Sequence, residues 1–186
     1  MPNPLFVLYC IYYNTAKGFY AMSNPSPSTY TLVPFERDDF STLLAFMTPL
    51  WKQTYQSILP EKQIDFLIEK YFTPSAIEAY VKQGYEYYKF QDENGRTAGV
   101  LVFVEKAEHT FMDKLYLLPG ARGKGLPTQA FALMAKRGKD ILLSVNRANE
   151  RAFCAYRKNG FTVEQEVEVP LKNGMVNLDY IMRKKV

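Results

Sequence analysis

Histidine and cysteine are scarce in this sequence, which has one histidine, His109, and two cysteines, Cys10 and Cys154, among 186 residues. A single histidine excludes a metal site that needs two histidine ligands, and it disfavours a Ser-His-Asp triad. The cysteines lie in unrelated contexts, without a CxxC pair or a Cys/His cluster, so neither a zinc site nor a disulfide framework is indicated. We therefore expect a cytoplasmic protein without a bound metal.

An apolar run long enough to cross a membrane is also lacking at the N-terminus. The stretch PLFVLYCIYY, at residues 4–13, is far shorter than the ~20 residues that a membrane helix needs, and no basic residue precedes it. The SNPSPST stretch after Met22 has the composition of a linker. We expect residues 1–29 to be an extension or linker without catalytic residues, with an edge strand or docking arm at 4–13 as the alternative. Residues 30–186 then form one domain, and no membrane partner is expected.

Neither sign of charge is in strong excess. Lys and Arg number 23 against 19 Asp and Glu, which gives a formal net charge of +4. This balance fits mild attraction to an anionic cofactor, whereas a nucleic-acid-binding protein usually carries a denser basic patch. No nucleic-acid partner is therefore expected.

The first half of the chain has mainly helical periodicity. A short strand over 30–35 is followed by three predicted helices, at about 40–55, 60–71 and 73–82. Aromatic residues on these helices, Trp51, Tyr55 and Tyr71, are interpreted as core residues, with the wall of a pocket as the alternative.

From Tyr85 the pattern becomes that of strands. The predicted strands cover residues 85–91, 98–104, 110–118, 140–145, 161–169 and 175–182. Helices are predicted over 127–136 and over 149–159, where Gly160 suits the end of the helix. This order predicts an α/β fold of mixed, α+β-like type, with helices on both faces of one mixed sheet. It is neither a doubly wound fold nor a helical bundle.

A glycine-rich loop lies between a predicted strand and a predicted helix, with the sequence PGARGKGL at residues 119–126. Small residues let backbone N–H groups surround an anion, and the N-terminus of the next helix adds partial positive charge. Arg122 and Lys124 raise the local potential further. A diphosphate is the ligand that such a loop is best suited to bind.

Other phosphate and nucleic-acid motifs fit this loop poorly. A Walker A loop needs Ser or Thr after Gly-Lys, but Gly125 follows Lys124, and the dinucleotide pattern GxGxxG is absent. The tetrad at 120–123 matches the GxxG of KH RNA-binding domains. A KH loop joins two helices, however, and this loop follows a strand. An ordinary strand-to-helix turn is the remaining alternative.

A second motif, NERAFCAYRKNGF, occupies residues 149–161. Here the sequence resembles the GNAT superfamily of N-acetyltransferases, whose fourth helix carries N-x-x-A-x-x-x-Y-x-x-x-G-F. Residues 122–126 match the first five positions of their Q/R-x-x-G-x-G/A loop, and residues 114–119 resemble the fourth strand of that family. The resemblance is good over about residues 97–184 and loose over 30–96.

The resemblance implies a sheet that splays between its fourth and fifth strands, with acetyl-CoA as cosubstrate. Backbone groups near Tyr116 and Leu117 would bind the pantetheine arm and polarise the thioester carbonyl. Asn149 would contact the arm, although Asn is also a favoured helix N-cap. The residues expected to hold the diphosphate are Arg122, Gly123, Lys124, Gly125, Leu126 and Thr128.

The resemblance also makes Tyr156 the candidate for protonating the leaving group. A CoA thiolate leaves more readily when a phenol donates a hydrogen bond or a proton to it. The alternative is an aromatic residue that packs the helix on the sheet.

The general base is less defined by the sequence. Many members of the family carry Glu on the fourth strand, but the matching residue here is Phe111. Asp113 is two residues further and would share the face of Phe111 in a regular strand, so it is the candidate base. A solvent-facing charge and proton removal through water are the alternatives. Direct attack by the amine in a ternary complex is the expected route.

Three hypotheses follow from these residues. The first is transfer of acetyl to a primary amine of a small molecule such as a polyamine, an amino acid or an aminated metabolite. The second, motivated by Phe111 and by Pro127 at the last loop position, is a CoA-binding regulatory module without turnover. The third is RNA binding through GxxG. The sequence leaves the acceptor and the oligomeric state open, a homodimer included.

Overall fold

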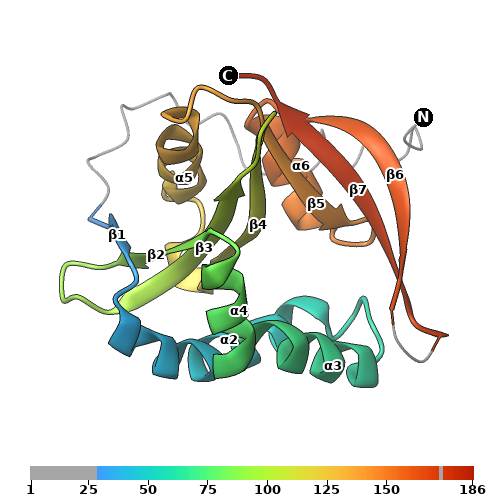
Figure 1. Ribbon diagram of the computed structural model, residues 1–186, viewed down its shortest axis with the longest axis horizontal. Coiled ribbons are helices and arrows are strands. Elements are labelled where there is room, and N and C mark those ends of the chain that lie inside the picture. Colours follow the sequence, from blue (N-terminus) through green and yellow to red (C-terminus); the bar gives the residue numbers. More distant parts are fainter. Residues whose placement is uncertain (1–28, 172–173) are drawn as a thin grey trace, which may run out of the picture.

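A seven-stranded mixed sheet runs through the computed structural model, which describes residues 29–171 and 174–186 (Figure 1). Helices α5 and α6 cover one face of the sheet, and α2, α3 and α4 cover the other. The elements are β1 (Thr31–Pro34), η1 (Arg37–Asp39), α2 (Phe40–Tyr55), α3 (Glu61–Phe72), α4 (Pro74–Lys82), β2 (Tyr85–Gln91), β3 (Thr97–Glu105), β4 (Thr110–Leu117), η2 (Pro119–Ala121), α5 (Leu126–Ala135), β5 (Ile141–Asn146), α6 (Glu150–Lys158), β6 (Thr162–Pro170) and β7 (Val176–Lys184). The predicted mixed fold with helices on both faces is confirmed.

The N-terminal segment lies outside this description. Residues 1–28 are not among the described residues, so the predicted extension and the domain boundary at residue 30 stay predictions. Within the described part of the chain, no helix combines the length and the hydropathy that crossing a membrane requires.

The order of the strands across the sheet is β1-β2-β3-β4-β5-β7-β6. β4 and β5 are parallel, and every other neighbouring pair is antiparallel. The last strand, β7, therefore lies between β5 and β6, one strand away from the gap described next.

The sheet opens between β4 and β5. These strands pair only from Thr110↔Ile141 to Met112↔Leu143, and beyond this point they diverge. The register of β4 against β3 also shifts here, from Phe103↔Met112 to Val102↔Lys114, so Asp113 is the extra residue of a β-bulge. Since a bulge bends its strand, it helps to turn β4 away from β5. The splay that the resemblance implied is confirmed.

Two apolar cores flank the sheet, because side chains alternate between its faces along each strand. On β3, Leu101 and Phe103 join the core under α5 and α6, whereas Val100 and Val102 join the core under α2, α3 and α4. All four are fully buried. The near-continuous apolar run of β3 follows from this burial on both faces.

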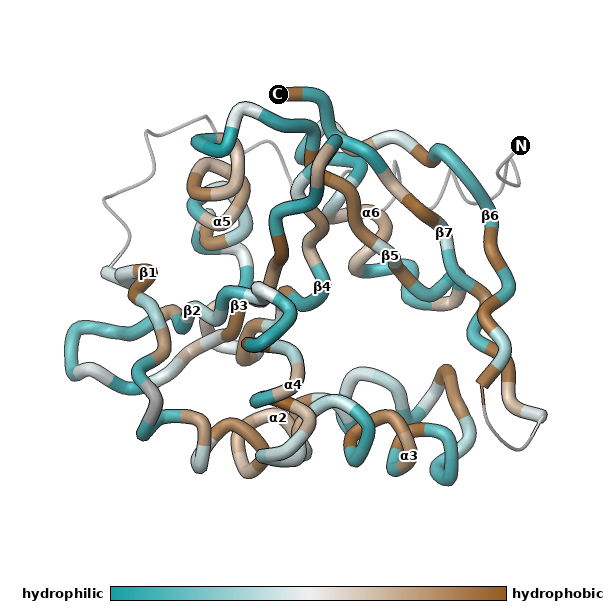
Figure 2. The backbone as a smooth tube through the Cα atoms, in the orientation of Figure 1, coloured by the Kyte–Doolittle hydropathy of each residue, from teal (hydrophilic) through white to brown (hydrophobic). Residues whose placement is uncertain are grey.

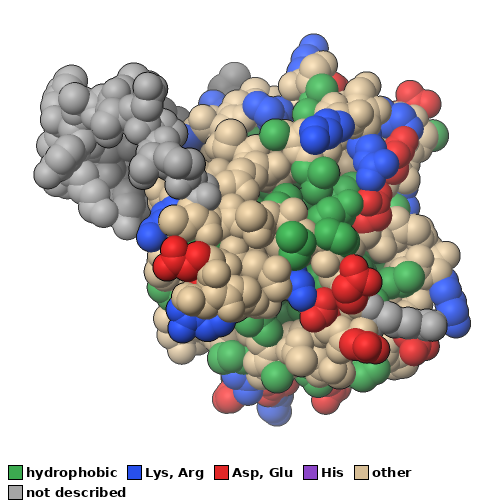
Figure 3. All heavy atoms as spheres, turned by 90° about the vertical axis from the view of Figure 1, so that its left-hand side faces the viewer, with side chains coloured by type: hydrophobic (Ala, Val, Ile, Leu, Met, Phe, Trp, Pro, Cys, Tyr) green, Lys and Arg blue, Asp and Glu red, His purple; other side chains and the backbone are tan. Residues whose placement is uncertain are grey.

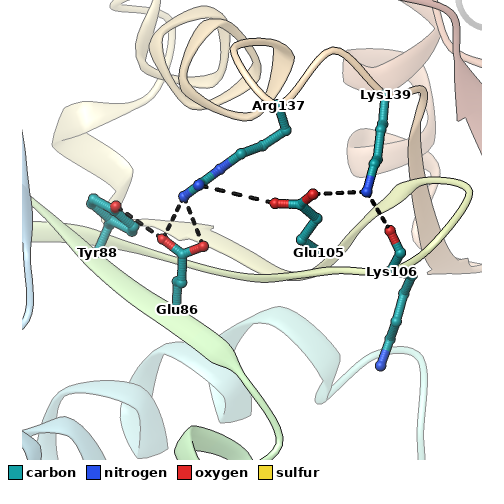
Figure 4. Close-up of polar contacts among 6 residues, drawn as sticks. All are labelled: Glu86, Tyr88, Glu105, Lys106, Arg137 and Lys139. Carbon is teal, nitrogen blue, oxygen red and sulfur yellow. Dashed lines mark hydrogen bonds and ion pairs between the residues drawn. The ribbon is translucent and has the colours of Figure 1, made fainter.

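An ion-pair network fastens the segment after α5 to the β2–β3 hairpin (Figure 4). Arg137 Nη2 donates to both carboxylate oxygens of Glu86, at 2.8 Å each, and the Tyr88 hydroxyl donates to the same carboxylate at 3.2 Å. Glu105 accepts from Lys139 at 2.7 Å and lies 4.0 Å from Arg137. The network joins residues that are far apart in sequence, so it contributes to tertiary rather than local stability.

We expect the Arg137–Glu86 pair to stabilise the fold modestly. A double-mutant cycle of Arg137→Met with Glu86→Gln should give a coupling free energy of unfolding of about 0.5–1 kcal/mol, because both side chains are partly exposed to water. Urea unfolding of the two single variants, the double variant and the parent measures it. A coupling near zero would show that the network contributes nothing to stability.

Candidate active site

Two cavities open along the gap between β4 and β5. The first, of about 300 Å³, lies beside the glycine-rich loop and α6, and we call it the loop-side cavity. The second, of about 330 Å³, lies beside α2, α3 and the β6–β7 hairpin, and we call it the helix-side cavity. Four residues line both cavities: Tyr55, Asp113, Tyr116 and Ser144. The cavities therefore meet at the splay, and two small ligands could contact each other there.

The glycine-rich loop forms a cradle of backbone donors. Gly123 and Gly125 both have φ of +76°, a left-handed conformation that glycine adopts without strain. The N–H groups from Gly123 to Leu126 donate to no other residue of the described chain. With the N-terminus of α5 behind them, these groups fit an anion such as a diphosphate. Pro127 lacks an N–H, but it follows this run of donors and does not interrupt it.

Positive charge gathers on the wall of the loop-side cavity. Arg122 and Arg151 both line it. Burial and the positive charge of Arg151 lower the pKa of Arg122, and the Nε of Arg122 donates to the carbonyl of Leu117 at 3.1 Å. An anionic guest would offset the repulsion between the two guanidinium groups.

The predicted cofactor-binding residues divide between the wall of the cavity and its surroundings. The wall contains Tyr116, Leu117, Arg122, Gly123 and Asn149. Four others lie outside it: Lys124, Gly125, Leu126 and Thr128. The Lys124 ammonium is 5.7 Å from the ring centre of Tyr30, and the Leu126 side chain is buried in the core. Gly125 and Thr128 lie at the start of α5.

The free edge of β4 presents backbone groups to the gap. The N–H of Leu118 donates to the carbonyl of Ala98 on the β3 side. Because hydrogen-bonding groups alternate along an antiparallel strand, the N–H and C=O groups of every second residue, including Tyr116, also face β3. The N–H groups of Leu115 and Leu117 consequently point towards the gap, where β5 has diverged. The N–H of Leu117 thus faces the gap, whereas the backbone of Tyr116 faces β3 and its hydroxyl bonds that of Tyr55 at 2.8 Å.

Tyr156 and Asn149 reach the loop-side cavity from α6. The Asn149 side chain accepts from Ala152 N at 3.2 Å, so it caps α6 while lining the cavity. The Tyr156 ring packs against Phe131 and Phe161. Burial and the neighbouring Tyr55 raise the pKa of Tyr156, so its phenol stays protonated and able to donate.

Asp113 lies at the junction of the cavities, but it is already paired. Its carboxylate accepts from the ammonium of Lys114, which is buried. The rings of Tyr71, Phe72 and Tyr80 surround that ammonium at 4.4–5.6 Å from their centres. The regular strand assumed for Asp113 is replaced by the bulge, which brings the neighbouring Asp113 and Lys114 side chains together.

A second carboxylate, Asp179 on β7, was missed by the sequence interpretation. It lines the helix-side cavity and accepts from Ser144 Oγ at 2.8 Å, beside the junction. Burial raises the pKa of Asp179, while the Ser144 bond and Arg147 lower it. No local motif marks Asp179 or Ser144, because strand alternation alone does not indicate which strands become neighbours.

The aromatic residues of α2 and α3 have both of the roles considered for them. Trp51 is buried in the core, and Tyr55 and Tyr71 pack against that core. All three also line the helix-side cavity. The core interpretation is correct, and the same side chains form an aromatic wall.

The features that suggested RNA binding look different in three dimensions. The loop joins β4 to α5 through η2, not one helix to another as in a KH domain. On the face seen in Figure 3, basic and acidic side chains are interspersed. This arrangement differs from the dense basic surface typical of nucleic-acid binding.

Comparison with known proteins gives a family and a fold. The profile of the acetyltransferase (GNAT) family matches residues 51–161. The comparison with curated proteins finds no match.

Solved structures share the fold over most of the chain. The Thermoplasma acidophilum PaiA N-acetyltransferase in complex with coenzyme A is 24% identical, with a TM-score of 0.67 over 84% of this chain and 99% of that one. A GCN5-related N-acetyltransferase from Rhodopseudomonas palustris is 19% identical, with a TM-score of 0.68 over 91% and 100%. A variant of the Vibrio cholerae spermidine N-acetyltransferase SpeG is 21% identical, with a TM-score of 0.56 over 84% and 93%.

Proposed function

This chain belongs to the GNAT family of acetyltransferases, and we propose that it transfers the acetyl group of acetyl-CoA to a primary amine of a small molecule by direct attack in a ternary complex. The observation that carries the proposal is the meeting of two cavities at the β4–β5 gap. One cavity suits an anionic, extended ligand, and the other, with apolar walls and the carboxylate of Asp179, suits a small amine. Both ligands would reach the four residues at the junction.

Acetyl-CoA fits the loop-side cavity by its chemistry. The N–H groups from Gly123 to Leu126, with Arg122, would hold the diphosphate. The free N–H groups of Leu115 and Leu117 would bind the pantetheine arm and the thioester carbonyl oxygen. The coenzyme A in the Thermoplasma structure supports this assignment.

The reaction then follows from the positions of these groups. The neutral amine attacks the thioester carbon, and a backbone N–H at the β4 edge stabilises the oxyanion that forms. The C–S bond breaks, and Tyr156 donates its proton to the departing thiolate. The nitrogen then releases its extra proton, and water carries a proton back to the Tyr156 phenolate.

The first test is ligand-dependent thermal stability. Acetyl-CoA or CoA at ~100 times its Kd should add about 2.7 kcal/mol to the free energy of unfolding, and ATP should add little. Release of CoA thiol with a panel of primary amines then measures turnover. Tight CoA binding without thiol release for any amine would instead support a regulatory module. Absence of any shift with acetyl-CoA would contradict the assignment of the loop.

A further inference from the structure

The helix-side cavity has one carboxylate that no ammonium or guanidinium group neutralises. Its wall contains two acids, Asp113 and Asp179, and one base, Lys114. Lys114 is bound to Asp113, so these two charges cancel. Asp179 forms no ion pair with any lysine or arginine of the described chain. A ligand of this cavity therefore meets a single unpaired negative charge.

Arg147 affects the pKa of Asp179, but its guanidinium bonds other groups. Its guanidinium pairs with Glu166 at 3.3 Å and donates to the backbone carbonyls of Val167 and Asp179, at 3.1 and 3.4 Å. It lowers the pKa of the Asp179 carboxyl without bonding to its oxygens. Among the described residues, only Ser144 donates a hydrogen bond to that carboxylate. Its remaining acceptor sites are available to a ligand.

The rest of the wall is apolar or neutral. The β6–β7 hairpin alternates hydrophobic and hydrophilic residues (Figure 2), and its cavity-facing side includes Val167 and Val169. Leu171, directly after β6, adds to this side, and the apolar contributions of α2, α3 and the segment between them are Trp51, Leu59, Leu67 and Tyr71. The neutral amides are Asn146 and Asn177. Burial of an apolar group against this wall favours binding, whereas a second charge would be buried there without a partner, which disfavours binding.

Resting on the proposed acetyl transfer, we infer that the acceptor is a monoamine with an apolar, aromatic or alkyl body, held by its ammonium on Asp179. Ser144 lies at the junction of the cavities, so a nitrogen on Asp179 is next to the place where the thioester must lie. A polyamine would place a second ammonium on the apolar wall. An α-amino acid would place a carboxylate beside Asp179, and the one cation on the cavity wall, Lys114, is already paired with Asp113.

Asp179 also receives the first proton of the acceptor. The ammonium R–NH₃⁺ transfers one proton to the Asp179 carboxylate and becomes R–NH₂, which attacks the acetyl carbon. The nitrogen then carries one extra proton, and the sulfur of CoA gains one as the C–S bond breaks, through Tyr156. The products are R–NH–acetyl, CoA–SH and protonated Asp179, which returns its proton to water.

Paired amines that differ by one charge test the acceptor class. We expect kcat/KM with hexylamine to exceed that with 1,6-diaminohexane by about tenfold or more, since the diamine adds only a second ammonium. Phenethylamine should exceed phenylalanine by a similar factor. Equal or better turnover of the diamine or of phenylalanine would overturn the inference while leaving acetyl transfer established. No turnover of any amine by protein that binds acetyl-CoA would overturn the proposed function and this inference with it.

Variants of Asp179 test the residue itself. Asp179→Asn should lower kcat/KM for hexylamine by about 10- to 100-fold, and Asp179→Glu should restore part of it. The acetyl-CoA thermal shift should persist in both, because Asp179 does not line the loop-side cavity. The matched control is Glu168→Gln, which removes an exposed carboxylate of the same hairpin outside the cavity. Unchanged kcat/KM in Asp179→Asn, or an equal loss in Glu168→Gln, would overturn the assignment.

Discussion

Gly125→Glu is expected to abolish acetyl-CoA binding. Gly125 lies within the run of free N–H groups, directly before α5, and a Cβ added to it meets no protein atom within 4 Å. The new carboxylate would therefore extend into the open space that the diphosphate needs. It would repel the diphosphate and compensate the helix N-terminus in its place. Isothermal titration with acetyl-CoA measures the loss, and retained affinity would mean that the diphosphate binds elsewhere.

Gly95→Glu separates this effect from backbone strain. Gly95, in the β2–β3 turn, has φ of +75°, close to the +76° of Gly125, and it also has open space around it. The two substitutions carry the same charge and a similar conformational penalty. Gly95→Glu should therefore lose comparable stability but keep acetyl-CoA binding. Equal loss of binding in both variants would show that unfolding is the cause.

Tyr156→Phe is expected to lower kcat by roughly 10²-fold or more. The substitution removes only the hydroxyl, while the ring contacts with Phe131 and Phe161 remain. Because burial raises the pKa of Tyr156, the lost group is a protonated phenol that can donate to the thiolate. Steady-state release of CoA thiol measures kcat, and the thermal shift with acetyl-CoA should stay unchanged.

Tyr88→Phe is the matched control for that variant. The Tyr88 hydroxyl bonds Glu86 on β2, and Tyr88 lines neither cavity. Its loss should leave kcat within about twofold and reduce stability slightly. Unchanged turnover in Tyr156→Phe would remove Tyr156 from the reaction and leave it as a packing residue.

Local pattern predicted the elements well, even where one residue argued against them. Pro49 lies inside α2, where it removes a backbone hydrogen bond. The apolar stripe continues past it through the buried Leu50 and Trp51, and this burial outweighs the cost. The start of α5 at Leu126 instead of Pro127 has a local cause as well, because the left-handed Gly125 ends the loop one residue earlier.

The chemistry of the helix-side cavity was only partly predictable. Asp113 was selected because it would share a strand face with Phe111, and it does lie at the junction. Its pairing with Lys114 depends on a bulge that is defined by the register with β3. Asp179 was missed because β7 has no motif, and its partner Ser144 is 35 residues away in sequence.

The sequence by itself determined the order of the elements, the glycine-rich loop and the Asn149–Phe161 motif. Each of these depends on spacing within one or two neighbouring elements, where periodicity and backbone freedom act locally. Only the tertiary structure decided that β7 enters between β5 and β6, that the two cavities meet at four residues, and that Asp179 is the unpaired charge there. These features arise from contacts between distant segments, whose free energies depend on burial and pairing in the folded chain.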